Sequence, residues 1–187
     1  MIFSNFKLLL FTLAGVVLLF VVVFWGGSYF LPTINLNTVD DTDAQTSEVL
    51  LVGKKAPYFD LPDILGNHVR LDEFLNAPVL IVFWSTWSSA AADQLKILDD
   101  YNTTHEQLIK IVAIDSQEER SVASSFVRRG GYKVQILVDA LGATSDEYRI
   151  KSLPTLYFLD QDGVVKDTHV GVLSAKELGD KIEQLLR

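Results

Sequence analysis

The chain contains no cysteine in its 187 residues. It therefore forms no disulfide bond, offers no thiolate to a metal, and performs no chemistry that requires attack by a thiolate sulfur. Histidine is also scarce, and His68, His105 and His169 lack any spacing typical of metal ligands. We expect neither a metal site nor a cofactor.

Basic residues are few compared with acidic ones. Lys and Arg total 16 against 24 Asp and Glu, so the net charge is −8. Because affinity for nucleic acid depends on clustered Lys and Arg, and no basic stripe is present, nucleic acid is excluded as a partner. The acidic pairs Asp99-Asp100 and Glu118-Glu119 are predicted to lie on solvated helix faces, since adjacent helical residues point in different directions.

A long apolar segment stands near the N-terminus. Residues 8–25 contain no charge, and the apolar character continues to residue 30, which meets the length needed to cross a bilayer. We expect an uncleaved transmembrane anchor at 8–30, with residues 1–7 cytoplasmic because Lys7 precedes the span and acidic residues follow it. The alternative is a cleaved signal peptide, for which Gly26-Gly27-Ser28 offers small residues at the cleavage site.

The remainder divides into a linker and one domain. Residues 31–49 are rich in Thr, Asn and Asp and are predicted to form a flexible acidic linker. Residues 50–187 have the size of a typical single domain and can bury a proper core. With the N-terminus cytoplasmic, this domain is expected to lie outside the membrane.

The pattern within the domain predicts an α/β fold. Apolar runs rich in β-branched residues predict strands at 79–84, 108–114, 134–138, 156–159 and 164–170, after an opening hairpin at 59–61 and 68–70. Helical periodicity predicts helices at 89–102, 117–129 and 175–186. Two helix starts carry capping boxes, Ser116-x-x-Glu119 and Ser174-x-x-Glu177, and basic residues before Gly130-Gly131 suit a helix C-terminus.

The strand at 79–84 leads into a Trp-x-x-Trp sequence and a helix start. The segment from Val79 to Ala91 closely resembles the Trp-Cys-x-x-Cys site of the thioredoxin superfamily, with Ser88 and Ala91 in place of the two cysteines. Serine does not replace cysteine as a nucleophile here, because an aliphatic hydroxyl stays protonated without an adjacent general base. Ser88 or Ser89 is instead predicted to be the helix N-cap.

Two further motifs make the resemblance specific to the TlpA-like and AhpC-TSA-like redoxin proteins, which are often membrane-anchored. Residues 53–59 resemble their Gly-x-x-Ala-Pro-x-Phe opening, and residues 148–155 are similar to their Tyr-x-Val-x-x-x-Pro-Thr segment. The resemblance implies a thioredoxin-like fold, a central mixed sheet flanked by helices. It also implies that Pro154 is a cis-proline facing the helix start, and that the backbone at Leu153 pairs with an extended peptide.

The departures from the family pattern extend beyond the thiols. Val82 stands where thioredoxins carry a buried acid, and Ala90, Gln94 and Lys96 replace residues that TlpA-like proteins often place near the second cysteine. The loss of these helpers together with both thiols suggests a naturally degenerate site.

Three hypotheses for the function remain open. The first is a redox-inactive binding module, whose groove of Trp87, Ser88, Ser89, Leu153 and Pro154 holds an extended peptide or an envelope protein, for example a Cys-x-x-Cys paralogue. The second is a thiol-disulfide oxidoreductase or antioxidant redoxin, of which this chain is a cysteine-replaced variant or in which a partner supplies the thiol. The third is a structural domain with a vestigial groove.

Overall fold

The structure is a computed structural model that describes residues 51–105 and 108–187. The predicted anchor at 8–30, the cytoplasmic segment 1–7 and the linker 31–49 lie outside these residues. Within the described ranges, every helix is too short or too polar to cross a membrane.

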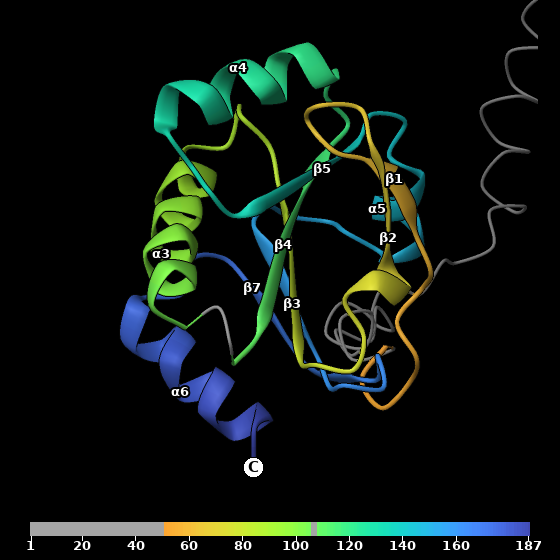
Figure 1. Cartoon of the computed structure of the whole chain (residues 1–187), viewed down its shortest axis with the longest axis vertical. Coiled ribbons are helices and arrows are strands. Elements are labelled where there is room, and N and C mark those ends of the chain that lie inside the picture. Colours follow the sequence, from red (N-terminus) through yellow and green to blue (C-terminus); the bar gives the residue numbers. More distant parts are fainter. Residues whose placement is uncertain (1–50, 106–107) are drawn as a thin grey trace, which may run out of the picture. The chain divides into compact units, whose positions relative to one another are not determined.

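A five-stranded mixed sheet forms the centre of the domain (Figure 1). Its strands are β3 (Val79–Trp84), β4 (Lys110–Ser116), β5 (Gln135–Asp139), β6 (Thr155–Leu159) and β7 (Val165–Val170). They are ordered β5-β4-β3-β6-β7, with β3, β4 and β5 parallel and with β6 and β7 antiparallel to their neighbours. The functional segments described below follow the carboxyl ends of β3 and β4, which the parallel pairing brings to one edge of the sheet.

Both faces of the sheet are covered, which explains why every residue of β3 is buried. One face packs against α3 (Ser89–His105), α4 (Arg120–Gly130) and α6 (Ala175–Leu185). The other packs against the hairpin of β1 (Asp60–Pro62) and β2 (His68–Arg70), the short helix η3 (Leu71–Glu73), and Tyr148, which follows α5 (Ala143–Glu147). Side chains of β3 alternate between the two cores, as the pleat of a strand requires.

The predicted α/β fold with a central mixed sheet flanked by helices is confirmed for the described residues, and most predicted elements there lie within a few residues of those observed. The capping box at Ser174 is present: the Ser174 hydroxyl accepts from the Glu177 N–H, and the Glu177 carboxylate accepts from the Ser174 N–H at 2.9 Å. At the end of α4, Gly131 adopts a left-handed conformation with φ 70° and donates its N–H to the Val127 carbonyl.

The start of α4 differs from the prediction. The second capping box is wrong, because Ser116 continues β4 and pairs with Asp139, whereas α4 begins only at Arg120. Gln117 bends the chain between the two elements with φ 62°. The five-residue helix α5 was not predicted, since its sequence has no apolar periodicity and its first turn is held by the side chain of Asp139.

The prediction of solvated acidic pairs is wrong for one residue of each pair. Asp99 accepts hydrogen bonds from the backbone N–H groups of Lys133 and Val134, which fixes the approach to β5. Glu118 binds the loop after β3, as described below. In both pairs the adjacent residues point in different directions, and one of them finds a backbone partner that is distant in sequence.

Candidate functional site

The turn between β3 and α3 presents an aromatic side chain to solvent. Because β3 ends at Trp84 and α3 begins at Ser89, residues 85–88 form a tight connection at the edge of the sheet. Trp87 is 70% exposed, which is unusual for so large an apolar side chain. Ser88 directly precedes the first helical residue, the position predicted for an N-cap, but its hydroxyl donates to the Leu153 carbonyl rather than to a backbone group of the helix.

Two hydrogen-bonded contacts tie this turn to the end of β4. The Ser85 hydroxyl donates to the Ser116 carbonyl at 2.6 Å. The Glu118 carboxylate accepts from both the N–H and the hydroxyl of Thr86, at 2.6 and 2.7 Å. Bonds to an ionised acceptor are among the stronger ones in proteins, so Glu118 fixes the backbone immediately before Trp87.

A buried carboxyl lies beside this contact. Asp115 is the second-last residue of β4 and is fully buried, and neither of its oxygens has a hydrogen-bond partner among the described residues. Burial raises the pKa of Asp115 to about 8, and the nearby carboxylates of Glu118 and Asp139 act in the same direction. At neutral pH the carboxyl of Asp115 is therefore mostly protonated.

The loop before β6 faces the turn from the other side. The Leu153–Pro154 peptide bond is cis, as the resemblance implied, and Pro154 is buried. The Ser88 hydroxyl lies 3.5 Å from the Leu153 carbonyl oxygen, a long contact that leaves this acceptor weakly engaged. The Leu153 N–H has no hydrogen-bond partner among the described residues. The structure therefore brings Trp87, Ser88 and the Leu153-Pro154 backbone together.

The positions of the family cysteines carry no reactive group. Ala91 is completely buried against the core beneath α3, and the Ser88 hydroxyl has no His or carboxylate partner in the part of the chain that the structure describes. A serine in that setting lacks the base that it needs to become a nucleophile. Across residues 51–105 and 108–187, no three His, Asp or Glu side chains are placed to hold a metal ion.

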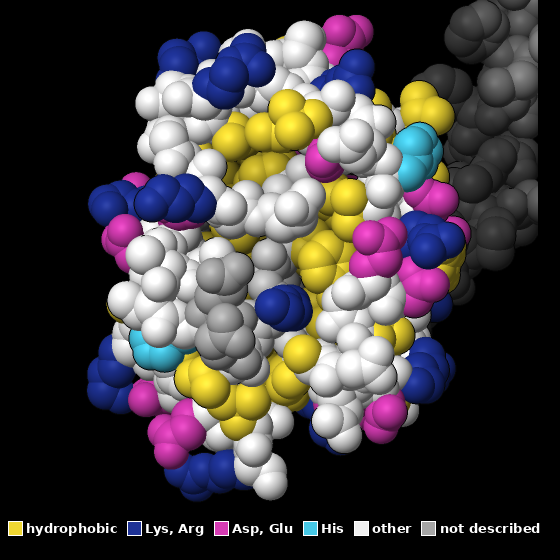
Figure 2. Space-filling model, viewed as in Figure 1, with side chains coloured by type: hydrophobic (Ala, Val, Ile, Leu, Met, Phe, Trp, Pro, Cys, Tyr) yellow, Lys and Arg dark blue, Asp and Glu magenta, His cyan; other side chains and the backbone are white. Residues whose placement is uncertain are grey.

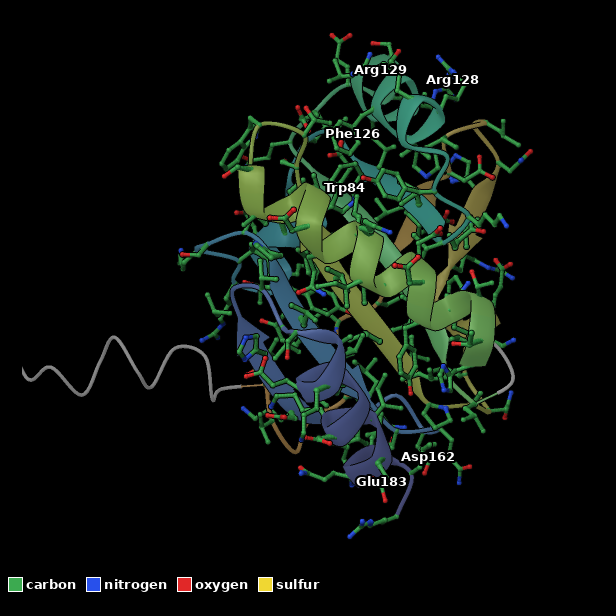
Figure 3. All side chains as sticks on the ribbon, turned by 90° about the vertical axis from the view of Figure 1, so that its left-hand side faces the viewer. Trp84, Phe126, Arg128, Arg129, Asp162 and Glu183 are labelled. Atoms are coloured by element: carbon green, nitrogen blue, oxygen red, sulfur yellow. The ribbon has the colours of Figure 1, made fainter. Side chains whose placement is uncertain are left out.

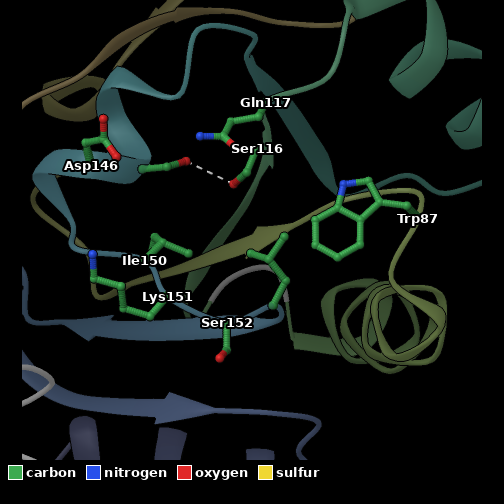
Figure 4. A pocket seen from close by; sticks show the side chains of 9 residues that line it. Trp87, Ser116, Gln117, Asp146, Ile150, Lys151 and Ser152 are labelled. Carbon is green, nitrogen blue, oxygen red and sulfur yellow. Dashed lines mark hydrogen bonds between the residues drawn. The ribbon is translucent and has the colours of Figure 1, made fainter. Parts of the chain in front are cut away.

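A cavity of about 150 Å³ opens beside Trp87 (Figure 4). Its lining comes from the ends of β3 and β4, from α5, and from the loop before β6: Trp87, Ser116, Gln117, Ser145, Asp146, Ile150, Lys151, Ser152 and Leu153. Trp87 stands at one end in the figure, and Ser116 lies between it and α5. The cavity therefore includes Trp87 and Leu153 of the predicted groove, together with residues of β4 and α5 that the prediction did not include.

Sequence reasoning missed the residues contributed by β4 and α5. Ser116 and Glu118 were assigned to a helix start and a solvated face, and Ser145 lies in the helix that was not predicted. One signal was present: Asp115 and Ser116 follow an apolar run, and the carboxyl ends of parallel strands meet at one edge of a sheet. That rule would have placed both residues beside the turn at Trp87.

The chain has a mixed five-stranded sheet, an exposed tryptophan after the central strand, and a cis-proline that faces this tryptophan. These features place it in the class of thioredoxin-like proteins. Residues 52–168 match the model of the AhpC/TSA family, and the chain belongs to that family.

Relatives in this class support the assignment. The thioredoxin-like protein YneN of Bacillus subtilis is 25% identical over 91% of this chain and 96% of its own length. The thiol-disulfide oxidoreductase ResA of Bacillus thuringiensis is 26% identical over 74% of this chain and 80% of its own.

Solved structures show the same fold. A structure from Chlorobium tepidum described as the thiol:disulfide interchange protein DsbE has a TM-score of 0.68 and 25% identity, and covers 73% of this chain and 98% of its own. The exposed lipoprotein thioredoxin Etrx1 of Streptococcus pneumoniae has a TM-score of 0.63 and covers 69% of this chain and 100% of its own; at 22% identity it supports the fold alone.

Proposed function

We propose that this protein is a redox-inactive thioredoxin-like module that binds an extended segment of another protein at the cell envelope, tethered by the anchor predicted at 8–30. The observation that carries the proposal is the contrast between the two halves of the site. The groove keeps its exposed Trp87 and its cis-Pro154, while the positions of the thiols hold Ser88 and a buried Ala91.

The backbone of Leu153 supplies the contact that an extended peptide needs. Its unpaired N–H and its weakly engaged carbonyl are a free donor and acceptor of the kind that pair in β-augmentation. Trp87 stands next to them as an aromatic anchor, the residue type that most often dominates binding energy at interfaces. None of these contacts requires a cysteine.

Some relatives are named thiol-disulfide oxidoreductases. These names favour a second candidate function, in which this chain assists a thiol-disulfide oxidoreductase reaction. In that case this chain holds the client while a partner, such as a Cys-x-x-Cys paralogue, supplies the thiolate. Both candidates use the same groove, and they differ in whether the trapped partner carries a redox-active pair.

The test is photocrosslinking in envelope membranes from the full chain with a photoreactive residue at position 88. Position 183, exposed on α6, is the control position. We expect a discrete adduct from position 88 alone, and Trp87→Ala should reduce its yield at least about tenfold, because truncating an interface hot spot costs about 2 kcal/mol or more.

A matched variant separates binding from stability. Leu65→Ala removes another exposed apolar side chain, at the β1–β2 turn, and should leave the adduct unchanged. Trp87→Ala should barely change the melting temperature, because most of its side chain is solvated. No adduct from position 88, together with a Trp87→Ala variant that is merely destabilised, would favour a structural domain with a vestigial groove.

A further inference from the structure

The cavity beside Trp87 has the size of a single side chain. At about 150 Å³ it matches the volume of an engineered protein cavity that takes up benzene. Trp87, Ile150 and Leu153 give it apolar walls, and the exposed face of the Trp87 ring is free for an aromatic stacking contact. These walls fit an aromatic ring of six atoms.

The cavity also has a polar floor with a defined arrangement of protons. Ser145 lies 2.8 Å from the Asp139 carboxylate and 3.0 Å from the Ser116 hydroxyl (dashed line in Figure 4). A carboxylate is a stronger acceptor than a hydroxyl, and Ser145 has only one hydroxyl hydrogen to donate. Ser145 therefore donates its hydrogen bond to Asp139, and the Ser116 hydroxyl donates to the Ser145 oxygen. The Ser116 oxygen is then left with lone pairs that can accept from a ligand.

Gln117 adds a donor on the same wall. Its side-chain amide makes no hydrogen bond with the described residues, and its left-handed backbone, φ 62°, is a conformation that non-glycine residues rarely adopt. A group that donates to Ser116 and accepts from Gln117 would satisfy both, and a hydroxyl does both at once.

The charges around the cavity select against an anionic ligand. The buried Asp139 behind the floor and Asp146 on the wall repel a carboxylate. A neutral ring with a hydroxyl at its tip meets every one of these requirements.

We propose that the cavity receives the side chain of a tyrosine in the bound segment, with its ring against Trp87 and its hydroxyl at Ser116 and Gln117. This rests on the proposed function and gives it sequence specificity. Since Ser152 and Leu153 line the cavity, a peptide paired with the Leu153 backbone can place an adjacent side chain in it.

Binding of short blocked peptides to the full chain in detergent, followed by calorimetry, tests the proposal. The peptides are identical except at one central position, which carries Tyr, Phe, Leu or Glu. We expect the Tyr peptide to bind about fivefold more tightly than the Phe peptide, the size of one net hydrogen bond, and Glu to bind most weakly. N-acetyltyrosinamide serves as a free phenol without the peptide backbone.

Ser116→Ala makes the test specific to the floor. It removes the proposed acceptor while leaving the Ser145 bond to Asp139. The preference for the Tyr peptide over the Phe peptide should then fall, because only the contact with Gln117 is left. Ser124→Ala is the control, because Ser124 is a buried serine on α4 outside the cavity. A melting curve of each variant confirms that it is folded.

The outcomes separate the two proposals. If Tyr and Phe bind equally to the unaltered protein, or Ser116→Ala keeps the full preference, tyrosine selection is overturned while peptide binding stands. If N-acetyltyrosinamide binds as tightly as the Tyr peptide, the cavity is a site for free phenols and pairing at Leu153 is overturned. If no peptide binds, both the tyrosine pocket and the peptide-binding function fail.

Discussion

At the scale of single residues, the turn before α3 is held by the carboxylate of Glu118, which does not stand at either cysteine position. The Glu118 carboxylate accepts hydrogen bonds from the Thr86 N–H and hydroxyl. The buried carboxyl of Asp115, whose pKa is raised to about 8, lies near Glu118. A thioredoxin-like redox site uses its surroundings to tune a thiolate; here the surroundings hold the backbone of the turn. The backbone before Trp87 is thus held by Glu118, which follows the neighbouring strand β4, rather than by chemistry at Ser88.

The buried carboxyl predicts an unusual dependence of stability on pH. Because the folded-state pKa of Asp115 is raised to about 8, the native protein keeps a proton that the unfolded chain releases above about pH 4. The free energy of unfolding contributed by this group is therefore fully present below about pH 4 and is lost as the pH rises to about 8. We expect a loss on the order of 1 kcal/mol or more over that range.

Urea denaturation at several pH values measures this effect in Asp115→Asn, whose amide keeps the shape of the protonated acid without titrating. We expect the variant to show a flatter pH profile and to be the more stable of the two at pH 8. Asp93→Asn makes the same change at an exposed position on α3 and should leave the profile as it is. Stability that rises from pH 4 to 8 because of Asp115 would mean that its carboxylate is ionised and paired in the fold.

At the scale of elements, Gly142 shows how the backbone of one turn shapes the cavity. Gly142 precedes α5 with φ +75°, and a Cβ there would lie 2.6 Å from the Gln117 amide nitrogen. We expect Gly142→Ala to lower the free energy of unfolding by about 1 to 2 kcal/mol, the cost of a left-handed residue with a side chain. It should also displace Gln117 and weaken the preference for the Tyr peptide.

A second glycine provides the matched control for this variant. Gly179 lies inside α6 with open space around it, so Gly179→Ala should stabilise the protein by about 0.5 to 1 kcal/mol. Thermal melting of both variants gives the comparison. Equal stability of Gly142→Ala and the unaltered chain would show that the turn relaxes without cost and that Gln117 is not held by it.

The elements also show where sequence reasoning is sufficient and where it fails. β3 and α6 were predictable because an apolar run and a capping box are local signals that tertiary contacts reinforce. The start of α4 was not predictable, because the sequence around Ser116 is compatible both with a helix cap and with a strand. Pairing with β5, which the local sequence does not show, places Ser116 in the strand. In the site, Trp87 and Pro154 were found by motif, but Ser116 and Ser145 meet only through the sheet.

At the scale of the whole domain, charge and packing are unevenly distributed. Although the chain is acidic, Lys and Arg side chains occur over α4 and at several other places on the face shown in Figure 2, and Arg128 and Arg129 lie at one end of that helix (Figure 3). Both belong to its last turn, where cations are favoured by the helix dipole. Beneath α4, Trp84 packs on Phe126 with ring centroids 5.4 Å apart. The helix dipole thus accounts for the two arginines at this end of α4.

The final prediction concerns how the whole chain is placed in the cell. Residues 8–25 are uncharged and lead through an acidic linker to the domain, so the full chain should remain in the membrane after carbonate extraction. Protease added from outside the membrane should release a fragment beginning within residues 32–53, because the linker is polar and the domain after it is packed. Lys7→Glu together with added basic residues in the linker should reduce this release, since the charge bias sets the orientation. Recovery of a soluble mature protein starting near Tyr29 would instead show that the apolar segment is a cleaved signal peptide.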